Sequence, residues 1–122
     1  SFGFAAAAGA ANVCEVTVTP QDAAGSAIAD TRPLLVWLSD DSDGVGLTAT
    51  SASGTVQVKS GEGTDFGVQE AKKCILVQPK AAGTYVLEIT DTSKTLFYVA
   101  AASIDGRAAS VAAQLEIGDY GT

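Results

Sequence analysis

Apolar and polar residues alternate with a period of two along most of the chain after residue 12, which is the spacing of half-buried β-strands. The first such run, VCEVTVT, ends at Pro20. The second, RPLLVWLSD, is apolar on both faces, so we expect a central strand there. Further alternating runs, separated by turn-forming Gly, Asp and Pro, predict strands over 45–50, 55–60, 72–79, 84–91, 95–102 and 108–117.

The last of these runs, AASVAAQLEI, keeps a helical alternative, because alanine also favours helices. With it, the chain has about seven to nine short strands at intervals of roughly 8–12 residues, the cadence of an antiparallel sandwich or barrel. We expect an all-β fold, an immunoglobulin-like antiparallel β-sandwich over residues 13–118. Residues 119–122 would form a C-terminal tail.

The first twelve residues, SFGFAAAAGAAN, do not alternate and are rich in Ala and Gly. They are too few, and too interrupted by glycine, for a stable free helix. We expect an extended N-terminal arm over residues 1–12. Phe2 and Phe4, with Val13 beyond them, would dock on a neighbouring subunit or add a strand to its sheet. The alternative is a disordered terminus.

The length and the net charge of the chain argue against several classes of function. A chain of 122 residues is one domain. Its net charge of -7 argues against binding nucleic acid or an anionic membrane surface. No apolar run is long enough to span a bilayer, and the N-terminus lacks the basic residues of a signal peptide. A start at Ser fits a processed or trimmed chain, or a domain of a longer tail protein.

The acidic stretch DDSDG follows the central apolar run and raises the question of a calcium loop. If Gly44 takes the sixth position of a helix–loop–helix calcium loop, Thr50 stands where the bidentate Glu is needed. The flanks also read as strands. We therefore interpret Asp40, Asp41 and Asp43 as an exposed turn between two strands, with weak surface calcium binding as the alternative.

Residues for catalysis are scarce. The chain has no His, the commonest general base and triad member. The glycine-rich SGEGTDFG carries acids where a phosphate loop needs a Lys. We expect no enzymatic activity and no cofactor or metal. The cysteines, Cys14 and Cys74, could form an inter-sheet disulfide or remain two buried thiols, and both alternatives stay open.

Two aromatic residues fit the core of an immunoglobulin-like sandwich. Trp37 lies in the central run, where such domains often place a core Trp; the alternative is an exposed ligand platform. The stretch AAGTYVLEIT is similar to a tyrosine corner, in which a Tyr hydroxyl bonds back to the backbone. Leu87 stands where antibody domains have a Cys, so the similarity is one of architecture.

At LLVWLSDDSDGVGLTATSASGTV and GTYVLEITDTSKTLFYVAA the chain resembles small immunoglobulin-like modules of tailed-bacteriophage virion proteins. The resemblance covers most of residues 12–117, including NVCEVT and VWLSD. It implies a non-enzymatic structural protein of the phage particle, foremost a capsid decoration or cement protein. Its partner would be the major capsid protein or another virion protein, bound in many copies or as a homo-oligomer. It would sit on the particle surface after assembly in the host cytoplasm.

A second interpretation is a tail- or fibre-associated binding module that attaches weakly to glycans or to a cell-surface protein. It needs an exposed aromatic or acidic loop surface. The candidates are the loops 40–44, 60–67 and 105–107, with Tyr120 near the C-terminus.

Overall fold

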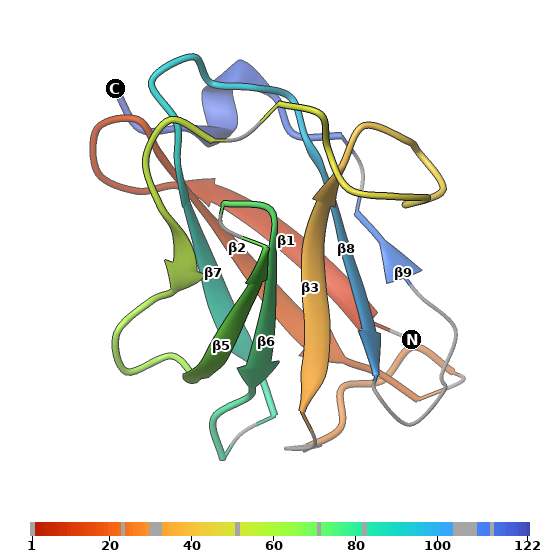
Figure 1. The fold of residues 1–122 in the computed structure, drawn as a ribbon. Coiled ribbons are helices and arrows are strands. Elements are labelled where there is room, and N and C mark those ends of the chain that lie inside the picture. Colours follow the sequence, from red (N-terminus) through yellow and green to blue (C-terminus); the bar gives the residue numbers. More distant parts are fainter. Residues whose placement is uncertain are drawn as a thin grey trace.

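The computed structural model describes residues 2–22, 24–29, 33–50, 52–70, 72–81, 83–103, 110–112 and 114–122. Within them, two antiparallel sheets pack face to face, which confirms the predicted all-β sandwich (Figure 1). The first sheet has the order β1 (Phe2–Ala8), β2 (Val13–Pro20), β7 (Tyr85–Thr90), β4 (Val56–Val58). The second has the order β5 (Thr64–Glu70), β6 (Cys74–Gln78), β3 (Leu34–Ser39), β8 (Tyr98–Ser103), β9 (Ser110–Val111).

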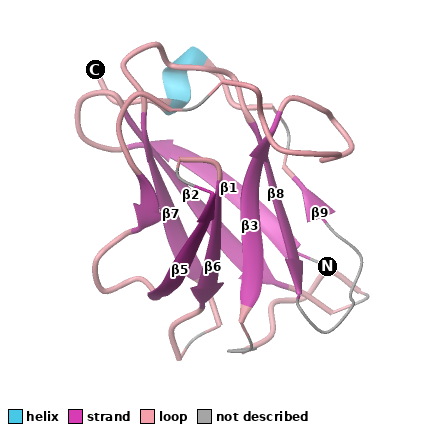
Figure 2. Ribbon diagram, in the orientation of Figure 1, coloured by secondary structure: helices cyan, strands magenta, loops and turns pink. Residues whose placement is uncertain are grey.

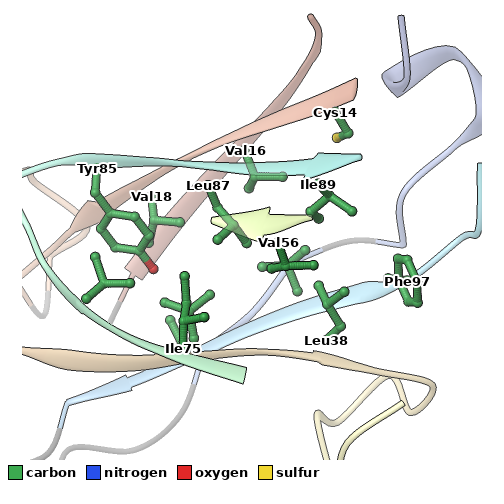
Figure 3. Packing of buried hydrophobic residues seen from close by; sticks show 14 of the residues in the cluster. Cys14, Val16, Val18, Leu38, Val56, Ile75, Tyr85, Leu87, Ile89 and Phe97 are labelled. Atoms are coloured by element: carbon green, nitrogen blue, oxygen red, sulfur yellow. The ribbon is translucent and has the colours of Figure 1, made fainter. Parts of the chain in front are cut away.

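The core lies between the two sheets and is built from the inward positions of each alternating run (Figure 3). Strand β2 contributes Cys14, Val16 and Val18, as the alternation predicts, and all three are fully buried. Strand β3 of the second sheet and strand β7 of the first also bury every second side chain in the core. Burying an aliphatic or aromatic side chain contributes about 1.5–3 kcal/mol. The burial of these inward side chains is therefore the main stabilising contribution to the fold.

The residues expected as an N-terminal arm are part of the first sheet. Strand β1 pairs antiparallel with β2 along its whole length, from Phe2 opposite Pro20 to Ala8 opposite Cys14. The segment is extended, as expected, but it is an edge strand of the sandwich and not an arm that projects from it. Pairing satisfies the backbone groups of β2 on this side, and it lets Phe2 bury its side chain in the core.

The strand expected at 45–50 is not formed, and this prediction is wrong. Residues 40–50 are a loop in which Val45 and Leu47 are largely exposed. Strand β3 already pairs with β6 on one side and β8 on the other. A hairpin partner following β3 directly therefore has no free edge to join, however well its residues alternate.

Two further segments differ from the sequence prediction. Thr64–Glu70, expected to lie largely in a loop, is strand β5 and pairs with β6. Among the described residues of the run 108–117, Ser110–Val111 is the strand, and a 3₁₀ helix, η1 (Ile117–Asp119), follows (Figure 2). No helix among the described residues is both long and apolar enough to cross a bilayer.

The expected C-terminal tail is anchored to the body of the protein. Tyr120 is only 1% exposed, and its hydroxyl donates a hydrogen bond to the carbonyl oxygen of Thr95 at 2.5 Å. Gly121 donates its N–H to the carbonyl of Val13 at 2.9 Å and accepts a hydrogen bond from Asn12 at 2.7 Å. Residues 120–121 therefore belong to the sandwich.

Candidate functional site

The outer edge of strand β1 is the feature of the fold best suited to bind another molecule. In an antiparallel pair, residues alternate between those that hydrogen-bond their neighbour and those whose N–H and C=O point away. Gly9 donates its N–H to the carbonyl of Val13, so Gly9 is a hydrogen-bonded position, and every second residue before it should also bond to β2. Gly3, Ala5 and Ala7 then bond to β2, and the residues between them point outward.

The rest of the structure agrees with this assignment. The N–H of Phe2 points away from β2 and donates to the Ser110 hydroxyl at 3.0 Å. Asp91 donates its N–H to the Asn12 carbonyl at 2.9 Å, so the even-numbered residues of β2 bond to β7. The odd-numbered residues of β2 are then the ones that bond to β1. Among the described residues, no strand pairs with the outer edge of β1. The backbone groups of Phe4, Ala6 and Ala8 are therefore open there.

A groove with a volume of about 290 Å³ lies beside this edge. The inner face of the first sheet supplies one side of the groove, and the C-terminal segment supplies the other. Apolar side chains dominate the first wall, whereas the second carries two carboxylates. The lining residues are Phe4, Ala6, Val16, Ala112, Gln114, Leu115, Glu116 and Asp119. The groove can therefore take an apolar group with a cation beside it.

The C-terminal wall is held in place by its own hydrogen bonds. The Asp119 carboxylate accepts the N–H of Glu116 at 2.8 Å, which closes the single turn of η1. Ala112 and Leu115 donate their N–H groups to the carbonyls of Val99 and Phe97 on the β8 side. The wall is thus fastened to the second sheet, while the facing wall belongs to the first.

The three residues expected to dock on a partner have different surroundings. Phe2 is only 7% exposed and packs in the protein's own core, so its side chain is not available to a partner in this fold. Phe4 is half-buried and lines the groove. Val13 is half-buried and lies opposite Thr90. Sequence patterns missed Glu116 and Asp119, because nothing local marks them as neighbours of β1.

Asp40 and Asp43 are exposed, as expected, and Asp41 is half-buried, but DDSDG is not a hairpin turn because no strand directly follows it in the described part of the chain. Asp40 accepts hydrogen bonds from the Thr48 hydroxyl at 2.5 Å and from the N–H of Ala49 at 3.0 Å. These hydrogen bonds lower the pKa of Asp40, and the bond from the Thr48 hydroxyl has the larger effect. Asp41 accepts the N–H of Asp43 at 2.9 Å. The carboxylates of Asp40 and Asp41 therefore organise the loop itself.

The same loop folds back over the outer face of the second sheet. Gly44 is buried, and a Cβ built on it would lie 2.8 Å from Val111 and 3.2 Å from Ala100. Trp37 projects from this outer face and is half-buried beneath the loop. In the part of the chain that the structure describes, no group of three or more His, Cys, Asp and Glu residues could hold a metal ion.

Cys14 and Cys74 are both buried thiols that form no disulfide with each other. Cys14 points into the core, with Val16 and Val18. In β6 it is Ile75 and Val77 that face the core, so Cys74 points to the opposite side of its sheet. Burial, with the Asp119 and Glu15 carboxylates nearby, raises the pKa of Cys14 to about 12.

The tyrosine corner expected at Tyr85 is not formed, and this prediction is wrong. Tyr85 points into the core between the sheets, and its hydroxyl has no hydrogen-bond partner among the described residues (Figure 3). It is the hydroxyl of Tyr120 that bonds to the backbone. Tyr120 is buried and so does not join an exposed aromatic surface, while the candidate loop 105–107 lies outside the described residues.

Comparisons with protein-family models, with curated proteins and with solved structures found no match to this chain.

Proposed function

We propose that the protein is a non-enzymatic structural subunit of a phage particle, of the capsid decoration or cement type, and that it attaches through the edge of strand β1. The observation that carries the proposal is this edge. An exposed edge strand is a template for pairing with another chain. Strand β1, FGFAAAA, carries neither the charges nor the proline that proteins use to block such pairing.

The character of the module supports the same proposal. The core is continuous and the C-terminal segment is anchored, so the edge is presented on a rigid body. A rigid, preorganised surface loses little entropy on binding. A weak contact of this kind becomes effective when many copies dock on one repetitive surface. The resemblance to virion modules supplies the identity of that surface, the shell of a phage particle.

Mass spectrometry of density-purified particles of the phage that encodes the chain tests the proposal. We expect the wild-type chain in many copies, at a constant ratio to the major shell protein. The variant Ala6→Pro should be missing from the particles, because the lost N–H belongs to the open edge. A wild-type chain absent from particles would overturn the proposal, and a few copies per particle would move it to the tail or fibre.

A further inference from the structure

We propose that the groove beside β1 binds a short extended segment of a partner protein, one that alternates apolar and basic side chains on its inward face. This inference rests on the proposed attachment at the β1 edge and names the chemistry of the partner. The segment would pair with the outward backbone groups of Phe4, Ala6 and Ala8. Its inward side chains would enter the groove.

The direction of the β1 side chains supports this arrangement. Phe4 and Ala6 lie opposite Val18 and Val16, which point into the core, so all four point to the inner side of the first sheet. Side chains of a strand paired to β1 follow the same alternation. A segment held by the outward backbone groups therefore places every second side chain in the cavity that Phe4 and Ala6 line.

The length of the segment follows from the two ends of the open edge of β1. At one end the N–H of Phe2 is bonded to Ser110. Beyond the other end, Ala11 and Gly121 form a parallel bridge. The open stretch of β1 is therefore Phe4–Ala8, which suits a chain terminus or an exposed loop better than a long strand.

The charge of the groove selects the partner. Glu116 and Asp119 line it beside apolar residues, and among the described residues no cation lines it. The chain as a whole has a net charge of -7. A Lys or Arg of the bound segment, next to an apolar side chain, would complement this surface. A second copy of the protein is a poorer occupant, because its own β1 has no basic residue and it would bring like-charged carboxylates.

Titration of the full ¹⁵N-labelled chain with the peptides Thr-Val-Thr-Lys-Thr, Thr-Val-Thr-Ser-Thr and Thr-Val-Thr-Glu-Thr tests this inference by NMR. We expect the Lys peptide to bind tightest and to shift the amide signals of Phe4, Ala6 and Ala8. Glu116→Gln should weaken the Lys peptide by about threefold and leave the Ser peptide unchanged. Asp43→Asn removes the same charge from the loop over the other sheet and should change neither.

Ala6→Pro should abolish binding of all three peptides while the rest of the spectrum stays folded. Equal binding of the three peptides to the wild type would overturn the preference for a basic segment. Shifts that persist in Ala6→Pro, or a stable dimer of the chain alone, would overturn strand addition by a partner. Attachment to particles that is lost in Ala6→Pro without any preference for Lys would leave the proposed function standing and this inference refuted. Preferential binding of the Lys peptide by a chain that is absent from particles would support this inference and refute the proposed function.

Discussion

The indole N–H of Trp37 donates a hydrogen bond to the backbone carbonyl of Gly44 across 2.9 Å. This bond fastens the acidic loop to the outer face of the second sheet, seven positions after the Trp in the chain. The loop is therefore a packed part of the fold, although its acidic sequence resembles that of a solvated turn. Because Trp37 is the single Trp of the chain, its fluorescence reports on this contact.

Gly44→Ala should release the loop. Gly44 and Gly46 both have positive φ angles, 75° and 72°, so an Ala at either position costs about 1–2 kcal/mol of backbone strain. Only at Gly44 would the added Cβ also meet a neighbour, Val111 at 2.8 Å, which adds about 1–3 kcal/mol. In denaturant unfolding, Gly44→Ala should have a lower free energy of unfolding than Gly46→Ala. Only the folded Gly44→Ala variant should show Trp37 fluorescence that differs from that of the wild type. Equal losses would contradict the packing of the loop.

Low pH should loosen the same loop. The Thr48 hydroxyl, and next the N–H of Ala49, hold the pKa of Asp40 below its ordinary value. The ionised carboxylate therefore stabilises the folded loop at pH values above that ordinary value, and the contribution is lost as the pH falls through the lowered pKa. Trp37 fluorescence should follow this loss in acid. Asp40→Asn should remove the transition, whereas Asp43→Asn should retain it.

Tyr85→Phe should stabilise the protein by about 1 kcal/mol, because it removes a buried hydroxyl that has no partner among the described residues. Tyr120→Phe is the matched control. It removes a hydroxyl that does bond, to Thr95, and should destabilise by about 1 kcal/mol. Thermal and urea unfolding of the two variants measure both effects. A Tyr85→Phe variant less stable than the wild type would show that the hydroxyl is satisfied.

Gly121→Ala should destabilise the protein by about 2–4 kcal/mol. A Cβ on Gly121 would lie 1.9 Å from the Ala10 carbonyl oxygen, so the anchored C-terminus would have to move. Gly118, in η1, has nothing within 4 Å of the corresponding Cβ position. Gly118→Ala should therefore leave the unfolding midpoint nearly unchanged. If both variants unfold alike, the C-terminal residues are not part of the cooperative core.

Proline substitutions in β1 should distinguish its two edges. The N–H of Ala7 bonds to β2, so Ala7→Pro removes a hydrogen bond of the sheet and should lower the thermal midpoint clearly. The N–H of Ala6 faces the open edge, where a proline removes no bond of the sheet. Ala6→Pro should therefore unfold close to the wild type. A reversed order of the two variants would mean that the alternation assigned to β1 is shifted by one residue.

Local pattern was sufficient where burial on one face of a strand is its main constraint. In β2 and β7 the alternation of Cys14, Val16 and Val18 and of Tyr85, Leu87 and Ile89 predicted the inward faces correctly. Period-two alternation follows from strand geometry alone and needs no knowledge of the neighbours. The sequence by itself therefore determined the all-β class, the sandwich and most of its core.

Tertiary structure decided which segments found a free edge. Residues 45–50 alternate like a strand, yet both edges of β3 are occupied, so they form a loop. The Ala-rich residues Phe2–Ala8 have no alternating pattern, yet the edge of β2 was open to them. Glu116 came to face β1 only because the C-terminal segment returns along β8. Pairing and proximity between distant segments depend on the whole arrangement of strands, which no local window of the sequence contains.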